Sequence, residues 1–240
     1  MKKVILVTGA AKGIGRGIVE ELSKNDENTI IVNYNKSKSE AIELKEKIGK
    51  NIEIYKADVT DNVEVNNMVN YIINKYGKID VLINNAGISQ IKMFNDITEE
   101  DWNNMISTNL TSAFFTTQAV IDNMIHNKNG CIINISSIWG MVGGSCEVHY
   151  SAAKAGLIGM SKALAKELGL SNIRVNVIAP GDIDTDMNNS LSKESIEIIK
   201  EETPLGRIGR PIDIARCVKW LIEDEFTTGQ VISPNGGWVI

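Results

Sequence analysis

The sequence has little cysteine, little histidine and no long apolar run, and each shortage excludes a class of protein. Its three cysteines, Cys131, Cys146 and Cys217, are widely spaced, and no two form a C-x-x-C pair. An odd, scattered set is typical of reduced thiols in a cytoplasmic protein, so we expect no disulfide framework and no metal site. No stretch approaches the ~18–20 apolar residues of a membrane span, and the run at residues 4–7 is too short for a signal peptide.

Positive charge is also scarce. The chain has 25 Lys and Arg residues against 30 Asp and Glu, which gives a net charge of −5 and a pI near 5.2. This balance lacks the basic footprint of a nucleic-acid-binding protein, so we expect neither a nucleic-acid nor a membrane partner. With four prolines and no Pro- or Gly-rich linker, the chain is expected to form one domain over residues 1–240.

Short runs rich in Val and Ile alternate with longer amphipathic stretches. Continuous apolar runs predict strands buried on both faces, which is typical of a parallel sheet, and helices between them favour a doubly wound α/β fold. The predicted strands cover residues 4–7, 29–33, 52–56, 81–83, 131–135, 175–178 and 230–232. The predicted helices cover residues 15–22, 40–48, 63–76, 99–125 and 152–168.

Residues 182–210 depart from this rhythm. The segment is polar, is interrupted by Pro204 and Gly206, and has helical composition over residues 188–202. Irregular segments of this length are often functional. A mobile lid over a substrate site and a plain helical excursion on the surface are both compatible with the sequence.

The first predicted strand runs into a glycine-rich turn, in which Gly9, Gly13 and Gly15 have the spacing G-x-x-x-G-x-G. Glycines between a strand and a helix let the backbone approach a pyrophosphate, whose charge the helix N-terminus then meets. The turn therefore indicates a dinucleotide site, with a purely structural turn as the alternative.

The end of the second strand indicates which dinucleotide is bound. NAD-binding proteins usually place an acid there, whereas this strand continues into Asn35 and Lys36. Lys36 and Lys12 are suited to neutralise the 2′-phosphate of NADPH, which an acid would repel. The alternative is that both lysines are solvated surface charges.

Tyr150 and Lys154 lie four residues apart, on one face of a predicted helix. A tyrosine has an ordinary pKa near 10, and a nearby ammonium is expected to lower that pKa and make proton transfer usable. Ser137 lies just beyond the strand at residues 131–135, at the edge where such sheets bind ligands. Alone, the pair could be a chance surface pair; together, the three residues predict a catalytic site.

With these residues the chain resembles the classical short-chain dehydrogenase/reductase family, over all 240 residues. The shared motifs are Thr8-Gly9-x-x-x-Gly13-x-Gly15, Asn84-Asn85-Ala86-Gly87, Asn109, Ser137, Tyr150-x-x-x-Lys154 and Pro180-Gly181. The resemblance implies a single doubly wound Rossmann-type domain, with a seven-stranded parallel sheet flanked by helices, and an NADPH-dependent carbonyl reductase.

The resemblance also implies roles for individual residues. Tyr150 would protonate the substrate carbonyl oxygen, and Ser137 would hydrogen-bond the same oxygen. Lys154 would hold the nicotinamide ribose, and Asn109 would support a water chain to Lys154. Asn84 is expected to brace the sheet. The expected cofactor contacts are Gly9, Lys12, Gly13, Ile14, Gly15, Asn35, Lys36, Asp58, Val59, Asn85, Ala86, Gly87, Tyr150, Lys154, Pro180, Gly181, Ile183 and Thr185.

Within the family, the chain is most similar to 3-oxoacyl-acyl-carrier-protein reductases of fatty acid biosynthesis, in residues 150–159, 179–187 and 235–237. This implies a 3-oxoacyl thioester as substrate, and Lys128 and Arg174 are the candidates for a basic rim toward the carrier protein. Residues 145–148 resemble a subgroup suspected of reducing a ketone on elongation factor P. A small-molecule ketone and a non-catalytic dinucleotide sensor are further alternatives.

The substrate wall is expected to include residues 143–149, just before the tyrosine. Family members are commonly homotetramers, which implies pairing through the helices at 99–125 and 152–168. The apolar end of the chain, residues 238–240, would then be buried at an interface.

Overall fold

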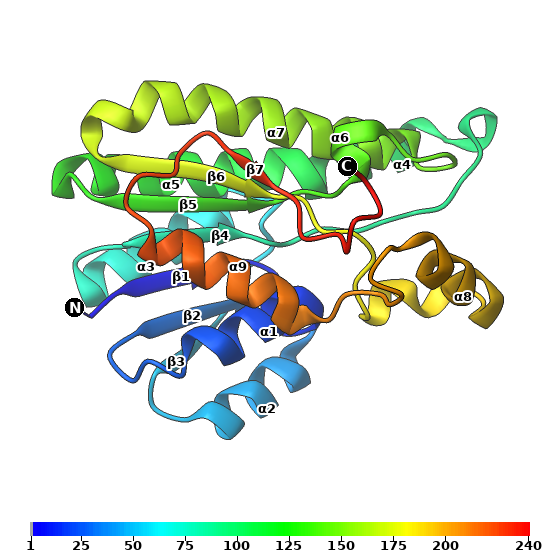
Figure 1. Ribbon diagram of the computed structural model, residues 1–240. Helices are drawn as coiled ribbons and strands as arrows, with labels where there is room; N and C mark the ends of the chain where they lie inside the picture. The colour runs from blue at the N-terminus through cyan, green and yellow to red at the C-terminus, as the bar shows by residue number, and fades with distance from the viewer. Residues whose placement is uncertain (1) are drawn as a thin grey trace.

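Seven parallel strands form one sheet in the order β3-β2-β1-β4-β5-β6-β7 in the computed structural model, which describes residues 2–240 (Figure 1). The strands are β1 (Val4–Val7), β2 (Thr29–Tyr34), β3 (Ile52–Lys56), β4 (Val81–Asn84), β5 (Gly130–Ile135), β6 (Ile173–Ile178) and β7 (Val231–Ile232). The strand order reverses between β1 and β4, and the sequence-predicted doubly wound sheet is confirmed. Each predicted strand is present, with ends shifted by at most two residues.

Helices cover both faces of the sheet (Figure 1). They are α1 (Gly13–Leu22), α2 (Lys38–Ile48), α3 (Asn62–Tyr76), α4 (Glu99–Ile106), α5 (Ser112–Asn127), α6 (Trp139–Val142), α7 (Val148–Leu168), α8 (Lys193–Glu202) and α9 (Pro211–Glu223). Alternate residues of each strand point to opposite faces. Ile5 and Val7 pack with α1, α2 and α9, whereas Val4 and Leu6 pack with α3, α5 and α7. Burial on both faces explains why the strands read as continuous apolar runs.

The helix predicted over residues 99–125 is interrupted. A π-helical turn, η2 (Ser107–Thr111), separates α4 from α5 and contains Asn109. Such turns occur often at functional sites, and this one aims the Asn109 side chain at the loop after β4. Apolar periodicity continues across the turn, so the sequence pattern alone predicted one helix.

The segment 182–210 contains a 3₁₀ turn, η4 (Asp186–Ser190), followed by α8, which extends away from the sheet (Figure 1). None of the described side chains of α8 is fully buried. The helical composition of this segment therefore does form a helix. Helix α9, which the sequence analysis missed, follows with Pro211 in its first turn, where proline is well tolerated.

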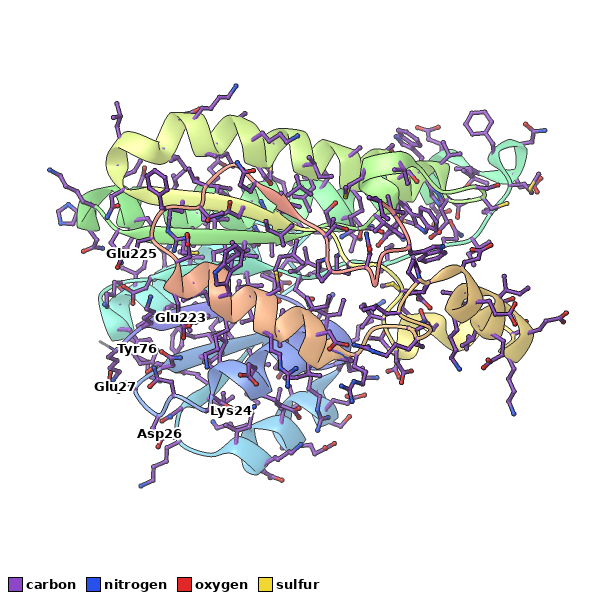
Figure 2. All side chains as sticks on the ribbon, in the orientation of Figure 1. Lys24, Asp26, Glu27, Tyr76, Glu223 and Glu225 are labelled. Atoms are coloured by element: carbon purple, nitrogen blue, oxygen red, sulfur yellow. The ribbon has the colours of Figure 1, made fainter. Side chains whose placement is uncertain are left out.

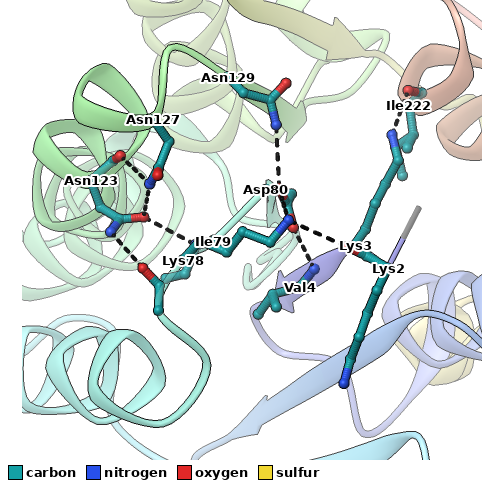
Figure 3. Close-up of polar contacts among 11 residues, drawn as sticks. Lys2, Lys3, Val4, Lys78, Ile79, Asp80, Asn123, Asn127, Asn129 and Ile222 are labelled. Carbon is teal, nitrogen blue, oxygen red and sulfur yellow. Dashed lines mark hydrogen bonds and ion pairs between the residues drawn. The ribbon is translucent and has the colours of Figure 1, made fainter.

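The amino ends of the strands are tied together by the buried carboxylate of Asp80 (Figure 3). Its oxygens accept hydrogen bonds from the Val4 amide at 2.7 Å, from Lys78 Nζ at 2.9 Å and from Asn129 Nδ2 at 3.3 Å. Glu223 and Glu225 lie at this same end of the molecule (Figure 2). Within residues 2–240, no helix is long and apolar enough to cross a membrane.

Candidate active site

A cleft of about 990 Å³ opens at the carboxyl ends of the strands, where the strand order reverses. Parallel sheets bind nucleotides at this position because the loops after β1 and β4 diverge there. The sequence-predicted residues that line the cleft are Gly9, Lys12, Gly13, Ile14, Asn35, Lys36, Asp58, Val59, Asn85, Ala86, Gly87, Asn109, Tyr150, Lys154 and Thr185. One fold feature thus brings together residues that are up to 176 positions apart, from Gly9 to Thr185.

The glycine-rich turn forms one wall of this cleft, and glycine is required there by close backbone approach. Gly9 has a φ of +59°, and a Cβ atom on it would lie 2.8 Å from the Ala86 Cα. Gly15 lies outside the cleft lining, and a Cβ there would lie 2.5 Å from Asn85 Nδ2. The third glycine of the motif therefore lets the start of α1 pack against Asn85 and the turn itself, and its predicted cofactor contact has no counterpart in the cleft wall.

The turn is held in place by the Asn84-Asn85 pair. The Asn85 amide donates to the carbonyl oxygens of Thr8 and Gly9, both at 3.0 Å, so its side chain is used in bracing the turn. Asn84 is buried and donates to Asn134 Oδ1 at 2.8 Å, while its oxygen accepts from Thr116. The predicted bracing role of Asn84 is therefore visible in its contacts.

At the far end of the cleft, Lys12 Nζ lies 2.6 Å from Glu40 Oε1 and 3.8 Å from Asp186 Oδ2. The hydrogen bond with Glu40 raises the pKa of Lys12, and the same bond lowers the pKa of Glu40 to about 2. Lys36 also lines the cleft. A phosphate bound to Lys12 would compete with Glu40 for its ammonium.

Asn109 faces the other end of the cleft. Its Nδ2 donates to the Ile88 carbonyl at 3.0 Å, and its Oδ1 accepts from the Ile88 amide at 3.2 Å. A Cβ on Gly87 would lie 2.6 Å from Asn109 Oδ1 and 3.4 Å from Lys154 Nζ. Glycine at position 87 therefore leaves open the space between Asn109 and Lys154.

Tyr150, Ser137 and Lys154 meet where the cleft deepens. Ser137 follows β5 and lies close enough to Tyr150 to lower the pKa of its hydroxyl, and the Ser137 Oγ accepts a hydrogen bond from the Trp139 amide at 3.1 Å. Lys154 Nζ lies 5.7 Å from the centroid of the Tyr150 ring and donates to the Ile135 carbonyl at 2.9 Å. The tyrosine is 8% exposed and the lysine 4%. The helix α7 thus presents both residues on one face, as their spacing predicts.

Burial controls the ionisation of this pair. It raises the pKa of Tyr150 to about 12, although the nearby Ser137 side chain acts in the opposite direction. Burial also lowers the pKa of Lys154 to about 8. Desolvation of the phenolate is thus the largest influence on the Tyr150 pKa, and the expectation that Lys154 lowers this pKa stays a prediction.

A second pocket, of about 360 Å³, adjoins the cleft at Tyr150. Ser137, Pro180, Gly181 and Ile183 line it, as do Trp139, Glu147, Asp182 and Trp238. Among the described residues of the expected wall at 143–149, Glu147 is the one that lines this pocket. Trp238 packs against Trp139 of its own chain, with ring centroids 5.3 Å apart. Part of its apolar surface is therefore covered without the subunit interface expected for residues 238–240.

His149, which precedes Tyr150, is fully buried and forms a hydrogen bond with Gln90 at 2.9 Å through Nε2. Burial lowers its pKa. Gln90 in turn donates to Asp101, so the histidine anchors the loop after β4 against α7. It packs the wall of the site and does not line either pocket.

A family model described as short chain dehydrogenase matches residues 3–196. The chain belongs to this family. Among its relatives is a 3-oxoacyl-[acyl-carrier-protein] reductase FabG of Chlamydia muridarum, 42% identical over 241 residues, covering 99% of this chain and 97% of that protein. The corresponding protein of Thermotoga maritima is 40% identical over 242 residues, covering 99% and 98%.

A similar solved structure is described as ElxO with NADP bound. It matches this short chain dehydrogenase with a TM-score of 0.92 and 33% identity, and the match covers 99% of both chains. The predicted family and the Rossmann-type fold are thereby confirmed. The protein is accordingly an oxidoreductase of the short-chain class. Among residues 2–240, no group of three or more His, Cys, Asp or Glu side chains is arranged to hold a metal ion.

Proposed function

We propose that this short chain dehydrogenase reduces a ketone with NADPH, and that the ketone is a 3-oxoacyl thioester on acyl carrier protein. The observation that carries the proposal is that two hydroxyls, those of Ser137 and Tyr150, line the second pocket together, with Tyr150 also lining the adjoining nucleotide cleft. Relatives of 40–42% identity over the whole chain are named as reductases of such thioesters.

The residues at this junction fit carbonyl reduction. Bound NADPH supplies the hydride. As negative charge develops on the carbonyl oxygen, the Tyr150 hydroxyl donates its proton and the Ser137 hydroxyl donates a hydrogen bond, both from fixed positions. Because the pKa of Tyr150 is about 12, the phenol carries its proton at neutral pH and acts as an acid. The Lys154 ammonium adds positive charge beside it, and Asn109 supports the path by which the proton is replaced.

We also propose that Lys12 and Lys36 bind the 2′-phosphate of NADPH. Both line the cleft at the end where Asn35 and Asp58 form a 2.8 Å hydrogen bond. The similar structure whose description includes NADP supports the same cofactor. Glycine at positions 9 and 87 lets the walls of the cleft pack closely, against Ala86 and Asn109 respectively.

The basic rim expected from Lys128 and Arg174 is not at the site. Lys128 follows α5, and Arg174 begins β6 and donates to the Leu221 carbonyl at 2.7 Å, so both lie at the amino ends of the strands. The carboxyl ends carry the site. This placement favours, as a second candidate, a ketone that is not on an acyl carrier, such as a small molecule or a ketone-bearing modification of elongation factor P.

Two further proposals concern the rest of the chain. The segment 182–210 acts as a lid, because Met187, Leu191 and Ile199 all line the second pocket. The chain forms a homotetramer through α4, α5 and α7, where Trp102 and Phe114 are exposed. Light scattering that gives a monomer mass would contradict the tetramer. The cytoplasmic location inferred from the cysteines stays a prediction.

The proposed activity is tested by NADPH oxidation with three substrates: an acetoacetyl thioester of acyl carrier protein, a free methyl ketone and a protein-bound ketone. Preference for the carrier thioester supports the first candidate, and preference for another ketone supports the second. Tight NADPH binding without turnover of any ketone would instead indicate a non-catalytic dinucleotide sensor.

A further inference from the structure

The second pocket carries negative charge where its neighbour, the nucleotide cleft, carries lysines. Glu147 and Asp182 both line it, together with the catalytic Ser137 and Tyr150. No Lys, Arg or His is among its lining residues in the part of the chain that the structure describes. A neutral 3-oxoacyl chain would therefore leave two carboxylates in this pocket without a counter-ion.

Both carboxylates are partly buried and only partly exposed to water. The Oδ2 atom of Asp182 is buried, with no hydrogen-bond partner among the described residues. Burial raises the pKa of Asp182, and bonding from Asn188 only partly offsets the effect. Burial also raises the pKa of Glu147, as does the nearby charge of Asp182. Buried carboxylates are costly unless they are paired, so this pair favours a cation between or beside them.

Two indole rings complete the pocket. Trp139 and Trp238 both line it, with centroids 5.3 Å apart and planes at 67°. Aromatic faces next to carboxylates are the arrangement that recognises alkylated ammonium groups. The aromatic pair is independent of the acidic pair, and both point to the same ligand chemistry.

We propose that this pocket selects ketones that carry a protonated amine, with Glu147 and Asp182 as specificity-determining residues. The inference rests on the proposed ketone reduction and adds a substrate class to it. The ketone oxygen lies at Ser137 and Tyr150, and the ammonium lies against the carboxylates and indoles. Glu147 precedes Tyr150 by about one helical turn, so the amine is only a few bonds from the carbonyl.

The test compares two ketones that differ only in charge. One is a methyl ketone with a dimethylamino group three methylenes from its carbonyl. The other is its hydrocarbon isostere, with CH in place of the protonated nitrogen. The full-length enzyme is assayed with NADPH at neutral pH, and kcat/KM is measured for each. We expect the wild type to prefer the cationic ketone at least tenfold.

Charge-removing variants locate the source of this preference. Glu147→Gln and Asp182→Asn each remove a negative charge from the pocket, and each should reduce the preference for the cationic over the neutral ketone at least threefold. Glu223→Gln, at the opposite end of the molecule (Figure 2), is the matched control and should keep the wild-type preference. Thermal unfolding and NADPH binding show whether each variant is folded.

The wild-type comparison needs no variant, so the inference is open to refutation even if both variants misfold. Equal or lower kcat/KM for the cationic ketone in the wild type overturns it, as does an unchanged preference in folded Glu147→Gln. If the neutral ketone or the acetoacetyl thioester is reduced without any preference for charge, the inference fails and the proposed function survives. If no ketone at all is reduced, both are overturned.

Discussion

The Lys154 ammonium lies 5.7 Å from the centroid of the Tyr150 ring and donates its hydrogen bond to the Ile135 carbonyl, not to the phenol. The two side chains are therefore neighbours without a direct hydrogen bond. Both are buried, and burial disfavours the charged form of each side chain. It therefore makes the Lys154 ammonium costly and favours the protonated form of Tyr150. That pairing suits an enzyme that donates a proton to a ketone.

Tyr150→Phe tests the proton donor. The phenyl ring fills the same space and removes only the hydroxyl, so kcat should fall by ~10²–10⁴, the usual worth of a general acid. NADPH binding should change little. Tyr71→Phe, in α3 and outside the lining of both pockets, is the control and should keep wild-type turnover. A Tyr150→Phe enzyme with full activity in NADPH oxidation would show that another group protonates the carbonyl oxygen.

Lys154→Met separates stability from activity. Burial lowers the pKa of Lys154 from 10.5 to about 8, so below pH 8 the folded state carries a charge that is costly to bury. At 1.36 kcal/mol per pKa unit the cost is about 3 kcal/mol, and the lost bond to Ile135 offsets about 1 kcal/mol of it. We expect the free energy of unfolding at pH 7 to rise by about 1–3 kcal/mol while activity is lost.

The sign of the pH effect is fixed by the same shift. Between pH 8 and 10.5 the folded lysine is neutral and the unfolded one still binds its proton, so in this window the destabilisation of wild type disappears as pH rises. The difference in the free energy of unfolding between Lys154→Met and wild type, measured by urea titration, should therefore become smaller from pH 7 to pH 9.5. In wild type, kcat/KM should decline as pH rises through about 8, because the ammonium is lost while Tyr150 stays protonated. A gap that widens with pH would contradict this account.

The sheet and most of the site could be predicted from sequence because local patterns specify them. Apolar runs mark strands buried on both faces, and the turn at Gly9 and the pair Tyr150 and Lys154 carry their chemistry in fixed spacing. The π-helical turn at Asn109 could not be predicted from the sequence, because apolar periodicity continues through it. The acidic pocket could not be predicted either, because Asp182 and Glu147 are 35 positions apart. They line one pocket only once β6 has paired with β5 in the folded protein. Trp238 is likewise far from Trp139 and Glu147 in the sequence and lines the pocket with them only in the folded protein.

Asp80→Ala tests the amino end of the sheet, far from the chemistry. The substitution leaves the buried Val4 amide without its 2.7 Å acceptor and removes the partners of Lys78 and Asn129. An unsatisfied buried donor costs about 1–3 kcal/mol, so the free energy of unfolding should fall by about that amount. Because the site lies at the opposite ends of the strands, kcat and KM for NADPH should stay near wild type. Asp122→Ala, on α5, serves as the surface control for the denaturant titrations. If folded Asp80→Ala lost much of its activity, the view that Asp80 contributes to stability and not to the site would be wrong.

Glu40 and Lys36 together test how the cleft distinguishes NADPH from NADH. The 2.6 Å contact between Glu40 and Lys12 holds that ammonium against a carboxylate which a 2′-phosphate must displace. Glu40→Gln should therefore tighten NADPH binding several-fold and leave NADH nearly unchanged, since NADH has no 2′-phosphate. Lys36→Asp should act in the opposite direction, because a carboxylate at the phosphate position repels it and accepts hydrogen bonds from a ribose hydroxyl instead. Fluorescence titration of both nucleotides, with Lys38→Gln in α2 as a neighbouring-charge control, gives the two ratios. Equal NADPH-to-NADH ratios in wild type and Lys36→Asp would show that the lysine lies outside phosphate recognition.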